Sequence, residues 1–406
     1  MAADLFLLLS GGLLFLAFLV EATFDRIRIP SVLILMSCGF LLGPVFHIFP
    51  SEQFQKVAPH FGALAFLLIL FEGGLDLRLG TVATGWQTGA FLAVRAFFVG
   101  FTLLFLVAWA GGMGASEAAI LAMCLAPISG SIVIPLASKL GLGEETRSVV
   151  VLEAATADVL GILGIGFLIT LFTGGVLATL VAVGSFFAVA FSVLLAALIG
   201  LWWPRVLRWL PEKRFADVLT FGLAMLLWAA VELPGASGAL AVLVFGLVLA
   251  NEGEILGKLG FPSEAVAEVA RATSEKLHGF IFQLTFLVRA FFFVFLGALV
   301  NLKEVTWLDG ILVLGLVGAM VLSRYWVLYP KGSGLPVAPE NKRTIWLVQP
   351  RGLVSAVLAM EAIQEGLARP RFLGLISAAI VLSNLLMLAG VGKSPKSSLN
   401  QSGPEL

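Results

Sequence analysis

Charge and cysteine are scarce in this sequence of 406 residues, of which only 12% are charged and two are cysteines. A soluble chain of this length needs far more polar surface, so large hydrophilic domains are excluded. The 25 basic and 25 acidic residues balance, which leaves no basic field for nucleic acid. Cys38 and Cys124 both lie in apolar stretches, so we expect neither disulfides nor thiolate metal sites.

Hydrophobic residues make up 60% of the chain, and the mean hydropathy is +1.05. Because a spanning helix takes ~20 apolar residues, we predict an all-α polytopic membrane protein. Thirteen apolar runs, bounded by charges, glycine and proline, are the candidate spans. They lie at about residues 4–22, 29–48, 58–77, 84–110, 115–139, 147–173, 175–203, 215–232, 236–251, 277–301, 308–329, 344–364 and 371–391. The first run lacks a preceding basic segment, so we interpret it as a retained span.

Lysine and arginine test this number of spans, because cytoplasmic connections are enriched in them. If all thirteen runs cross, seventeen basic residues of the connections fall on one side and four on the other. This asymmetry predicts that the N-terminus lies outside and the C-terminus in the cytoplasm. The expected location is a bacterial inner (plasma) membrane. Residues 392–406, rich in Ser, Lys and Pro, are predicted to form a disordered cytoplasmic tail.

Two of the runs contain residues that interrupt a spanning helix. The run at 115–139 contains Pro127, Gly130 and Pro135, and the run at 344–364 contains Pro350. Proline removes a backbone donor, and unwound backbone at membrane depth is tolerated only where it lines a cavity or is buried in protein. We therefore predict two discontinuous helices.

The interrupted runs are the fifth and the twelfth, so they cross the membrane in opposite directions. Interrupted helices at matching positions of two inverted halves indicate a transporter's substrate site. We predict two inverted six-helix repeats, joined by the seventh span, whose discontinuous helices cross. Arg351, beside the second break, is expected to neutralise the negative C-terminal ends of the half-helices. The alternative is that Pro127 and Pro350 are ordinary kinks.

Glu153 and Asp158 stand inside the sixth apolar run. A spacing of five residues puts them about 140° apart around a helix, so they meet different surroundings. We favour pairing with a buried arginine for Glu153, and a water-filled cavity for Asp158, which lies near the first break in sequence. The alternative is that both acids only satisfy buried arginines.

An unpaired, desolvated carboxylate such as that expected for Asp158 exchanges a proton near neutral pH. Among hydroxyl and carbonyl oxygens it is also a hard-cation site, suited to Na⁺ or K⁺ as the metal. One acid that holds either a proton or a metal ion, never both, couples the two by competition.

The order of these features resembles the cation/proton antiporter superfamily, specifically the sodium/proton exchangers with a thirteen-span membrane domain. The likeness covers nearly the whole chain and includes F-E-G-G-L-D at 71–76, P-R-G-L at 350–353 and the two acids of the sixth run, which match the family's E-S-x-x-N-D motif. The resemblance implies that Asp158 is the ion-binding aspartate.

The same resemblance implies roles for three further residues. Glu153 would be a structural glutamate that pairs with Arg324 of the eleventh span. Glu72 would line the cytoplasmic ion route, although an interfacial carboxylate beside Asp76 is the alternative for this residue. The scaffold helices would form a homodimer in contact with membrane lipid.

The sequence departs from the family pattern in two places. The family's T-D-P is S-G-S at residues 129–131, and Ala157 stands where Asn or Asp is expected before the essential acid. Asp158 is then the one unpaired acid deep in the predicted site. One carboxylate that exchanges one proton for one monovalent cation predicts electroneutral 1:1 exchange.

Three hydroxyl side chains are candidates to supply oxygen ligands in place of the missing groups. They are Ser129, Ser131 and Thr156. A hydroxyl bonded to its own helix backbone is the alternative for each of them.

These observations predict a secondary active antiporter, not an enzyme, that exchanges H⁺ for Na⁺ or K⁺ and needs no organic cofactor. The transmembrane domain would cover residues 1–391. Its moving core would be the spans at about 84–173 and 308–391, and its scaffold the spans at about 4–77 and 175–301.

Two alternatives remain open for the function. A sodium-coupled organic-anion symporter of related fold would normally have fewer spans, and the charge asymmetry argues against it. A transport-inactive sensor or scaffold would have lost activity together with the missing site residues.

Overall fold

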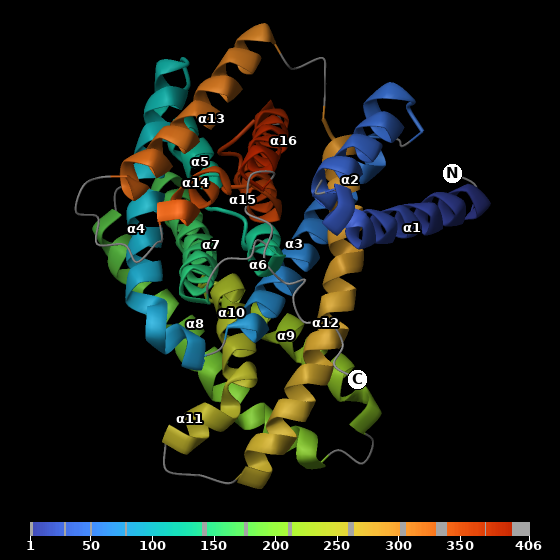
Figure 1. Cartoon of the computed structure of the whole chain (residues 1–406), viewed down its shortest axis with the longest axis vertical. Helices are drawn as coiled ribbons and strands as arrows, with labels where there is room; N and C mark the ends of the chain where they lie inside the picture. Colours follow the sequence, from blue (N-terminus) through green and yellow to red (C-terminus); the bar gives the residue numbers. More distant parts are fainter. Residues whose placement is uncertain are drawn as a thin grey trace.

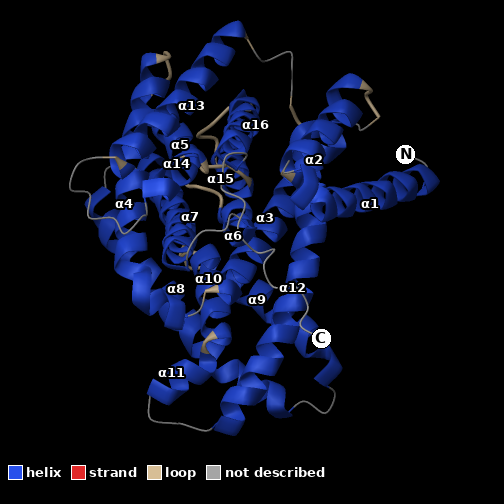
Figure 2. Ribbon diagram, viewed as in Figure 1, coloured by secondary structure: helices blue, strands red, loops and turns tan. Residues whose placement is uncertain are grey.

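The computed structural model describes residues 3–27, 30–48, 51–77, 79–139, 144–173, 178–209, 213–258, 264–300, 306–329, 339–369 and 371–391. Within these ranges the regular structure is helical and contains no strand (Figure 2), as an all-α chain requires. The predicted tail at 392–406 lies outside the described residues.

The helices follow one another with short connections. The first half contains α1 (Ala3–Ile27), α2 (Ser31–Phe40) with the π-helical turn η1 (Leu41–Val45), α3 (Ser51–Asp76), α4 (Leu79–Ala110), α5 (Ala115–Leu125), α6 (Gly130–Lys139) and α7 (Glu144–Thr173). The second half contains α8 (Ala178–Trp209), α9 (Ala216–Glu232), α10 (Gly238–Ala250), α11 (Glu252–Lys258), α12 (Glu264–Ala298), α13 (Trp307–Leu328), α14 (Pro339–Leu347), α15 (Leu353–Gln364) and α16 (Arg371–Val391).

The exterior of the helix bundle is apolar. In the described part of the chain, six helices are long and apolar enough to cross a membrane, namely α4, α7, α8, α12, α13 and α16. Large side chains such as Phe15, Phe187, Leu194, Leu226 and Trp307 are exposed on the surface. A surface of this kind suits hydrocarbon rather than water, so the protein is an integral membrane protein.

The helices pack as two groups that meet along a shared face. In one group, α4 contacts α5, α7 and α13, while α16 contacts α13, α14 and α15. In the other, α12 contacts α2 and α3, and α10 contacts α3, α8 and α9. Contacts of α15 with α3 and of α7 with α8 join the groups. Figure 1 shows α1 extending to the right of the bundle, next to α2 and α12.

Glycines let α3 and α10 approach until their backbones touch. A Cβ atom on Gly74 would lie 2.2 Å from the carbonyl oxygen of Leu243, and one on Gly246 would lie 2.6 Å from that of Phe71. No side chain fits into such a gap, so the second glycine of the F-E-G-G-L-D stretch has a packing role. A Cβ on the neighbouring Gly73 would meet only the Cδ1 atom of Leu243, at 4.0 Å.

This difference predicts opposite effects of one added methyl group at adjacent positions. Gly74→Ala should destabilise the protein by about 1–3 kcal/mol, because α3 and α10 must separate to admit it. Gly73→Ala, the matched control, should keep or slightly raise stability, because alanine favours the helix and meets open space. Thermal unfolding of the purified variants in detergent measures both effects, and equal melting temperatures would contradict the packing role of Gly74.

Candidate ion-binding site

Two helices are interrupted near Pro127 and Pro350, as predicted, whereas Pro135 lies inside the helix α6. α5 ends at Leu125 and α6 begins at Gly130, while α14 ends at Leu347 and α15 begins at Leu353. The two non-helical segments touch, because the backbone N–H of Ser129 donates a hydrogen bond to the carbonyl oxygen of Pro350 at 3.0 Å. The breaks therefore lie together although they are far apart in sequence.

Gly352 allows this close approach of the two segments. A Cβ atom at this position would lie 2.4 Å from Oγ of Ser129, so a larger residue would push the breaks apart. Ser129 itself is buried. The P-R-G-L stretch thus contains a glycine that the geometry of the crossing requires.

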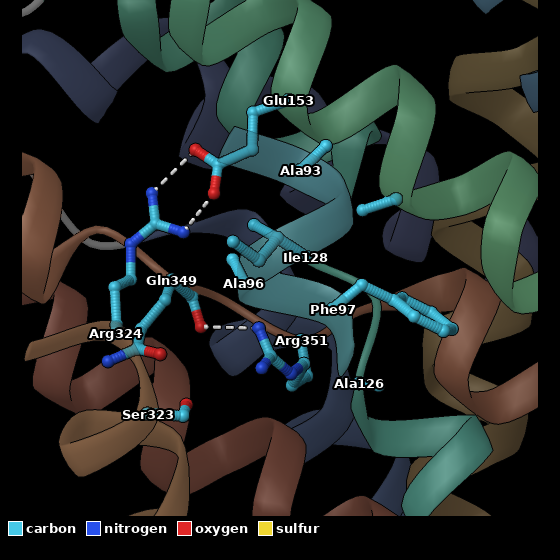
Figure 3. A pocket seen from close by; sticks show the side chains of 11 residues that line it. Ala93, Ala96, Phe97, Ala126, Ile128, Glu153, Ser323, Arg324, Gln349 and Arg351 are labelled. Atoms are coloured by element: carbon cyan, nitrogen blue, oxygen red, sulfur yellow. Dashed lines mark hydrogen bonds and ion pairs between the residues drawn. The ribbon is translucent and has the colours of Figure 1, made fainter. Parts of the chain in front are cut away.

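Arg351 is buried at the crossing and faces carbonyl oxygens. Its Nε atom donates to the carbonyl oxygen of Leu125 at 2.5 Å, and its Nη1 atom donates to that of Gln349 at 3.3 Å (Figure 3). Leu125 is the last residue of α5, where helix carbonyls lack partners and the helix dipole is negative. The guanidinium therefore lies where it can neutralise the end of a half-helix.

Glu153 and Arg324 form a buried ion pair between α7 and α13. Nη2 of Arg324 donates to Oε2 of Glu153 at 2.8 Å, and Nη1 donates to Oε1, so the pairing is bidentate (Figure 3). Nε of Arg324 also donates to the carbonyl oxygen of Ile345 at 2.9 Å. Ile345 lies in the last turn of α14, so Arg324 satisfies the second half-helix end as Arg351 satisfies the first.

The side chain of Asp158, on α7, reaches the beginning of α6 and forms no ion pair with an arginine among the described residues. Its Oδ2 atom accepts a hydrogen bond from the backbone N–H of Gly130 at 3.2 Å, and the residue is 7% exposed. Its Oδ1 atom is buried and has no hydrogen-bond partner among the described residues. A buried carboxylate oxygen without a partner is costly, so this atom is available for a proton or a cation.

The three candidate hydroxyl ligands stand differently toward Asp158. Ser129 directly precedes Gly130, which bonds to Asp158. Ser131 lies in α6, but its side chain is outside the described structure. Thr156 is half-buried on α7, two residues before Asp158, which places the two side chains about 160° apart around the helix.

Glu72 is not brought to this site. It is half-buried on α3, one turn before Asp76, whose Oδ1 atom lies 2.8 Å from Nε2 of His278 on α12. The pair of His278 and Asp76 was not expected from the sequence, because it joins positions 202 residues apart.

A small pocket lies between α4, α7, α13 and the two breaks (Figure 3). Its lining residues are Ala93, Ala96, Phe97, Ala126, Ile128, Glu153, Ala157, Ser323, Arg324, Gln349 and Arg351. Ala157, where the family pattern has Asn or Asp, is thus part of this pocket, whereas Asp158 is not among the lining residues. The small alanine side chains leave the space that the pocket occupies.

Sequence reasoning missed the part of α16 that faces the second break. Oγ of Ser383 accepts a hydrogen bond from the backbone N–H of Arg351 at 3.0 Å, and Nδ2 of Asn384 donates to the carbonyl oxygen of Arg351 at 2.8 Å. The available signal was an adjacent serine and asparagine inside an apolar run, because polar groups at membrane depth normally have a partner.

Touching helix breaks and buried charges in an apolar, all-helical chain define a membrane transporter rather than an enzyme. Residues 13–392 match the model of the family described as sodium/hydrogen exchanger, transmembrane. The chain belongs to this family.

The comparisons with known proteins give the same result. A curated relative, Na(+)/H(+) antiporter 1 of Methanocaldococcus jannaschii, is 24% identical over 370 residues, which cover 86% of this chain and 81% of the relative. A solved structure of the sodium proton antiporter MjNhaP1 from the same organism at pH 8 has a TM-score of 0.69, with 22% identity and 94% of each chain covered. An electron microscopy structure of MjNhaP1 has a TM-score of 0.70, with 20% identity over the whole of both chains.

The two acids of α7 should respond differently to neutralisation. Glu153→Gln leaves the buried Arg324 without its counter-charge, which should destabilise the protein by about 3–5 kcal/mol. Asp158→Asn is the matched control on the same helix, and it breaks no ion pair of the described residues, so its effect on stability should be much smaller. Unfolding of both variants in detergent tests this, and equal destabilisation would show that the two acids do not differ in this way.

Proposed function

We propose that this protein is a secondary active antiporter that exchanges H⁺ for Na⁺ or K⁺ by competition at Asp158. The observation that carries the proposal is the Oδ1 atom of Asp158, which is buried and unpartnered while Oδ2 is held by Gly130. Either a proton or a monovalent cation binds at Oδ1 of Asp158, and binding of one prevents binding of the other. Alternating exposure of the loaded site to the two membrane faces gives exchange.

The engagement of the two arginines supports this role for Asp158. The guanidinium of Arg324 donates hydrogen bonds to the carboxylate of Glu153 and to the carbonyl oxygen of Ile345. The guanidinium of Arg351 donates to the carbonyl oxygens of Leu125 and Gln349. Among the described residues, no ion pair joins either guanidinium to Asp158. The acid is therefore free to take a transported cation instead of a resident one.

The stoichiometry follows from the number of free acids at the breaks. Gly130 and Ala157 replace the acidic or amide side chains of the family pattern, so they add no charge next to Asp158. One carboxylate binds one proton or one monovalent cation. We therefore propose electroneutral 1:1 exchange, with Ser129 and Ser131 as candidate oxygen ligands. Thr156, on another side of α7 from Asp158, is not included in the proposed ligand set.

The architecture that we propose has thirteen membrane spans. The α2–η1, α5–α6 and α14–α15 segments each make one span, α11 makes none, and each remaining α-helix makes one. The broken spans are then the fifth and the twelfth and run in opposite directions, as in two inverted repeats. With the positive-inside asymmetry, the N-terminus lies outside and the C-terminus lies in the cytoplasm of a bacterial cell.

The packing of the helices supports a division into a moving core and a scaffold. The group of α4 to α7 and α13 to α16 contains both breaks and the charged side chains next to them, which are Glu153, Asp158, Arg324 and Arg351. The other group, with α2, α3, α8, α9, α10 and α12, would be the scaffold and the homodimer contact. Glu72 on α3 would line the cytoplasmic ion route between the two groups.

Ion exchange in everted membrane vesicles tests the role of Asp158. An imposed pH gradient should be dissipated when Na⁺ or K⁺ is added to wild-type vesicles. Asp158→Asn should reduce this signal to the level of vesicles without the protein, because the amide cannot exchange a proton for a cation. Glu365→Gln, which neutralises an exposed acid at the end of α15, is the control and should exchange normally. Full exchange by Asp158→Asn would contradict the proposal.

The stoichiometry is tested by setting the membrane potential of proteoliposomes with a gradient of the lipophilic cation tetraphenylphosphonium, which is not a candidate substrate, while Na⁺-driven proton movement is measured. Because a 1:1 exchange of monovalent ions moves no net charge, the rate should be the same at positive, zero and negative potential. A rate that changes steadily with voltage would require unequal numbers of protons and cations.

A further inference from the structure

In the unwound backbone between α14 and α15, the N–H groups of Val348 and Gln349 bond to carbonyl oxygens of α14, whereas the peptide groups nearer Arg351 need partners from other helices. Residues 348–352 are not helical, and Pro350 has no backbone N–H. Buried peptide groups without partners cost free energy, and the apolar interior of a membrane protein offers no water to replace them. The partners of this segment therefore show what holds the break in its shape.

The peptide groups next to Arg351 are held by another helix. The carbonyl oxygen of Pro350 is bonded by Ser129 of the first break. The N–H and the carbonyl of Arg351 are instead bonded by two side chains of α16, Ser383 at 3.0 Å and Asn384 at 2.8 Å. Adjacent residues of one helix thus hold both backbone groups of Arg351.

Both side chains are also fixed to their own helix. Oγ of Ser383 donates to the carbonyl oxygen of Ile380 at 3.0 Å, and Nδ2 of Asn384 donates to the same carbonyl oxygen at 2.8 Å. Asn384 is 0% exposed, and its Oδ1 atom has no partner among the described residues. The opposite amide orientation would place Oδ1 against two carbonyl oxygens, so Asn384 acts here as a donor.

The Arg351 side chain starts from this fixed peptide. Its guanidinium reaches the carbonyl oxygen of Leu125 at the end of α5. Asp158 is close in the same crossing, because Ser129 bonds to Pro350, the neighbour of Arg351, and Gly130, the neighbour of Ser129, bonds to Asp158. A displaced peptide at Arg351 would move the guanidinium, and with it the field that acts on the proton and the cation at Asp158.

We propose that Ser383 and Asn384 are positioning residues for ion exchange, which hold the Arg351 peptide and thereby keep its guanidinium at the end of α5. This proposal rests on the proposed function. Neither residue touches the transported ion. Their effect passes through Arg351, so their loss should change how protons and cations compete, and not only how stable the protein is.

The chain offers matched variants on α16. Ser383→Ala removes the hydroxyl that holds Arg351. Ser377→Ala removes the same atom from a buried serine of the same helix whose hydroxyl has no partner among the described residues. Ser383→Thr keeps the hydroxyl, whereas Ser383→Val has the same shape as the threonine variant without it. Asn384→Leu removes the amide donors.

The measurement is Na⁺-dependent proton movement in proteoliposomes, as an apparent KM for Na⁺ and as a rate profile across a series of pH values. Ser383→Ala, Ser383→Val and Asn384→Leu should change the apparent KM by about three- to tenfold, the factor expected for one neutral hydrogen bond, and should displace the pH profile. Ser377→Ala and Ser383→Thr should behave as wild type. Melting temperatures in detergent are measured on the same samples.

Two results would overturn the positioning role. One is a Ser383→Ala variant, or a Ser383→Val variant if the alanine variant does not accumulate, whose KM and pH profile equal those of Ser377→Ala. The other is a lower melting temperature or maximal rate with an unchanged KM and pH profile, because this describes a purely structural contact. Absence of exchange by the wild-type protein would instead contradict the antiporter assignment itself.

Discussion

The two helix breaks depend on one constraint, which is that unwound backbone inside an apolar protein must find hydrogen-bond partners. The two segments satisfy each other in part through Ser129 and Pro350. Carbonyl oxygens at the C-terminal ends of the half-helices accept hydrogen bonds from guanidinium groups. Arg351 donates to Leu125 at the end of α5, and Arg324 donates to Ile345 in the last turn of α14. The buried cations are therefore a consequence of the breaks, and buried Glu153 is in turn the counter-charge of Arg324.

The four charges at the breaks balance when the site is empty. Arg324 and Arg351 carry two positive charges, and ionised Glu153 and Asp158 carry two negative ones. Glu153 forms a bidentate ion pair with Arg324 and is therefore held in its ionised form. Asp158 is then the acid of this set whose charge would change during exchange. In the proposed mechanism, binding of a proton and binding of Na⁺ or K⁺ at Asp158 would give this set the same net charge. Both loaded states would then meet the same electrostatic barrier as the site moves, which is the condition for electroneutral exchange by one carboxylate.

The sequence predicted the features that a local signal marks. Proline and glycine inside apolar runs located both breaks, and two acids in one apolar run gave the residues of α7 that later proved to have different partners. The pair of Glu153 with Arg324 came from the family resemblance, because spacing alone does not choose among the buried arginines. The two breaks, the two acids of α7 and the pair of Glu153 with Arg324 could be predicted because each depends on a pattern within one helix or within the family motif.

The rest depends on distances that only the folded chain defines. The bond of Arg324 to Ile345 and the contacts of Ser383 and Asn384 with Arg351 join different helices, and a polar pair in an apolar run does not show which carbonyl it meets. Thr156 shows that residues close in sequence can also lie apart in space. It is close to Asp158 in sequence, but side chains two residues apart on a helix point about 160° apart, so closeness in sequence does not place both side chains in one site.

The departures from the family pattern leave the main chain with the task of holding Asp158. The aspartate of T-D-P is replaced by Gly130, and it is the backbone N–H of Gly130 that binds Oδ2. This N–H is at the beginning of α6, where the helix dipole is positive, so it supports a negative carboxylate without supplying a charge that would compete with the transported cation. A side chain at this position could change its own protonation state, but a backbone amide cannot. The field that Gly130 contributes would therefore be the same in every state of the transport cycle in which this bond is kept, and in the proposed mechanism the choice between proton and cation is left to the Oδ1 atom of Asp158.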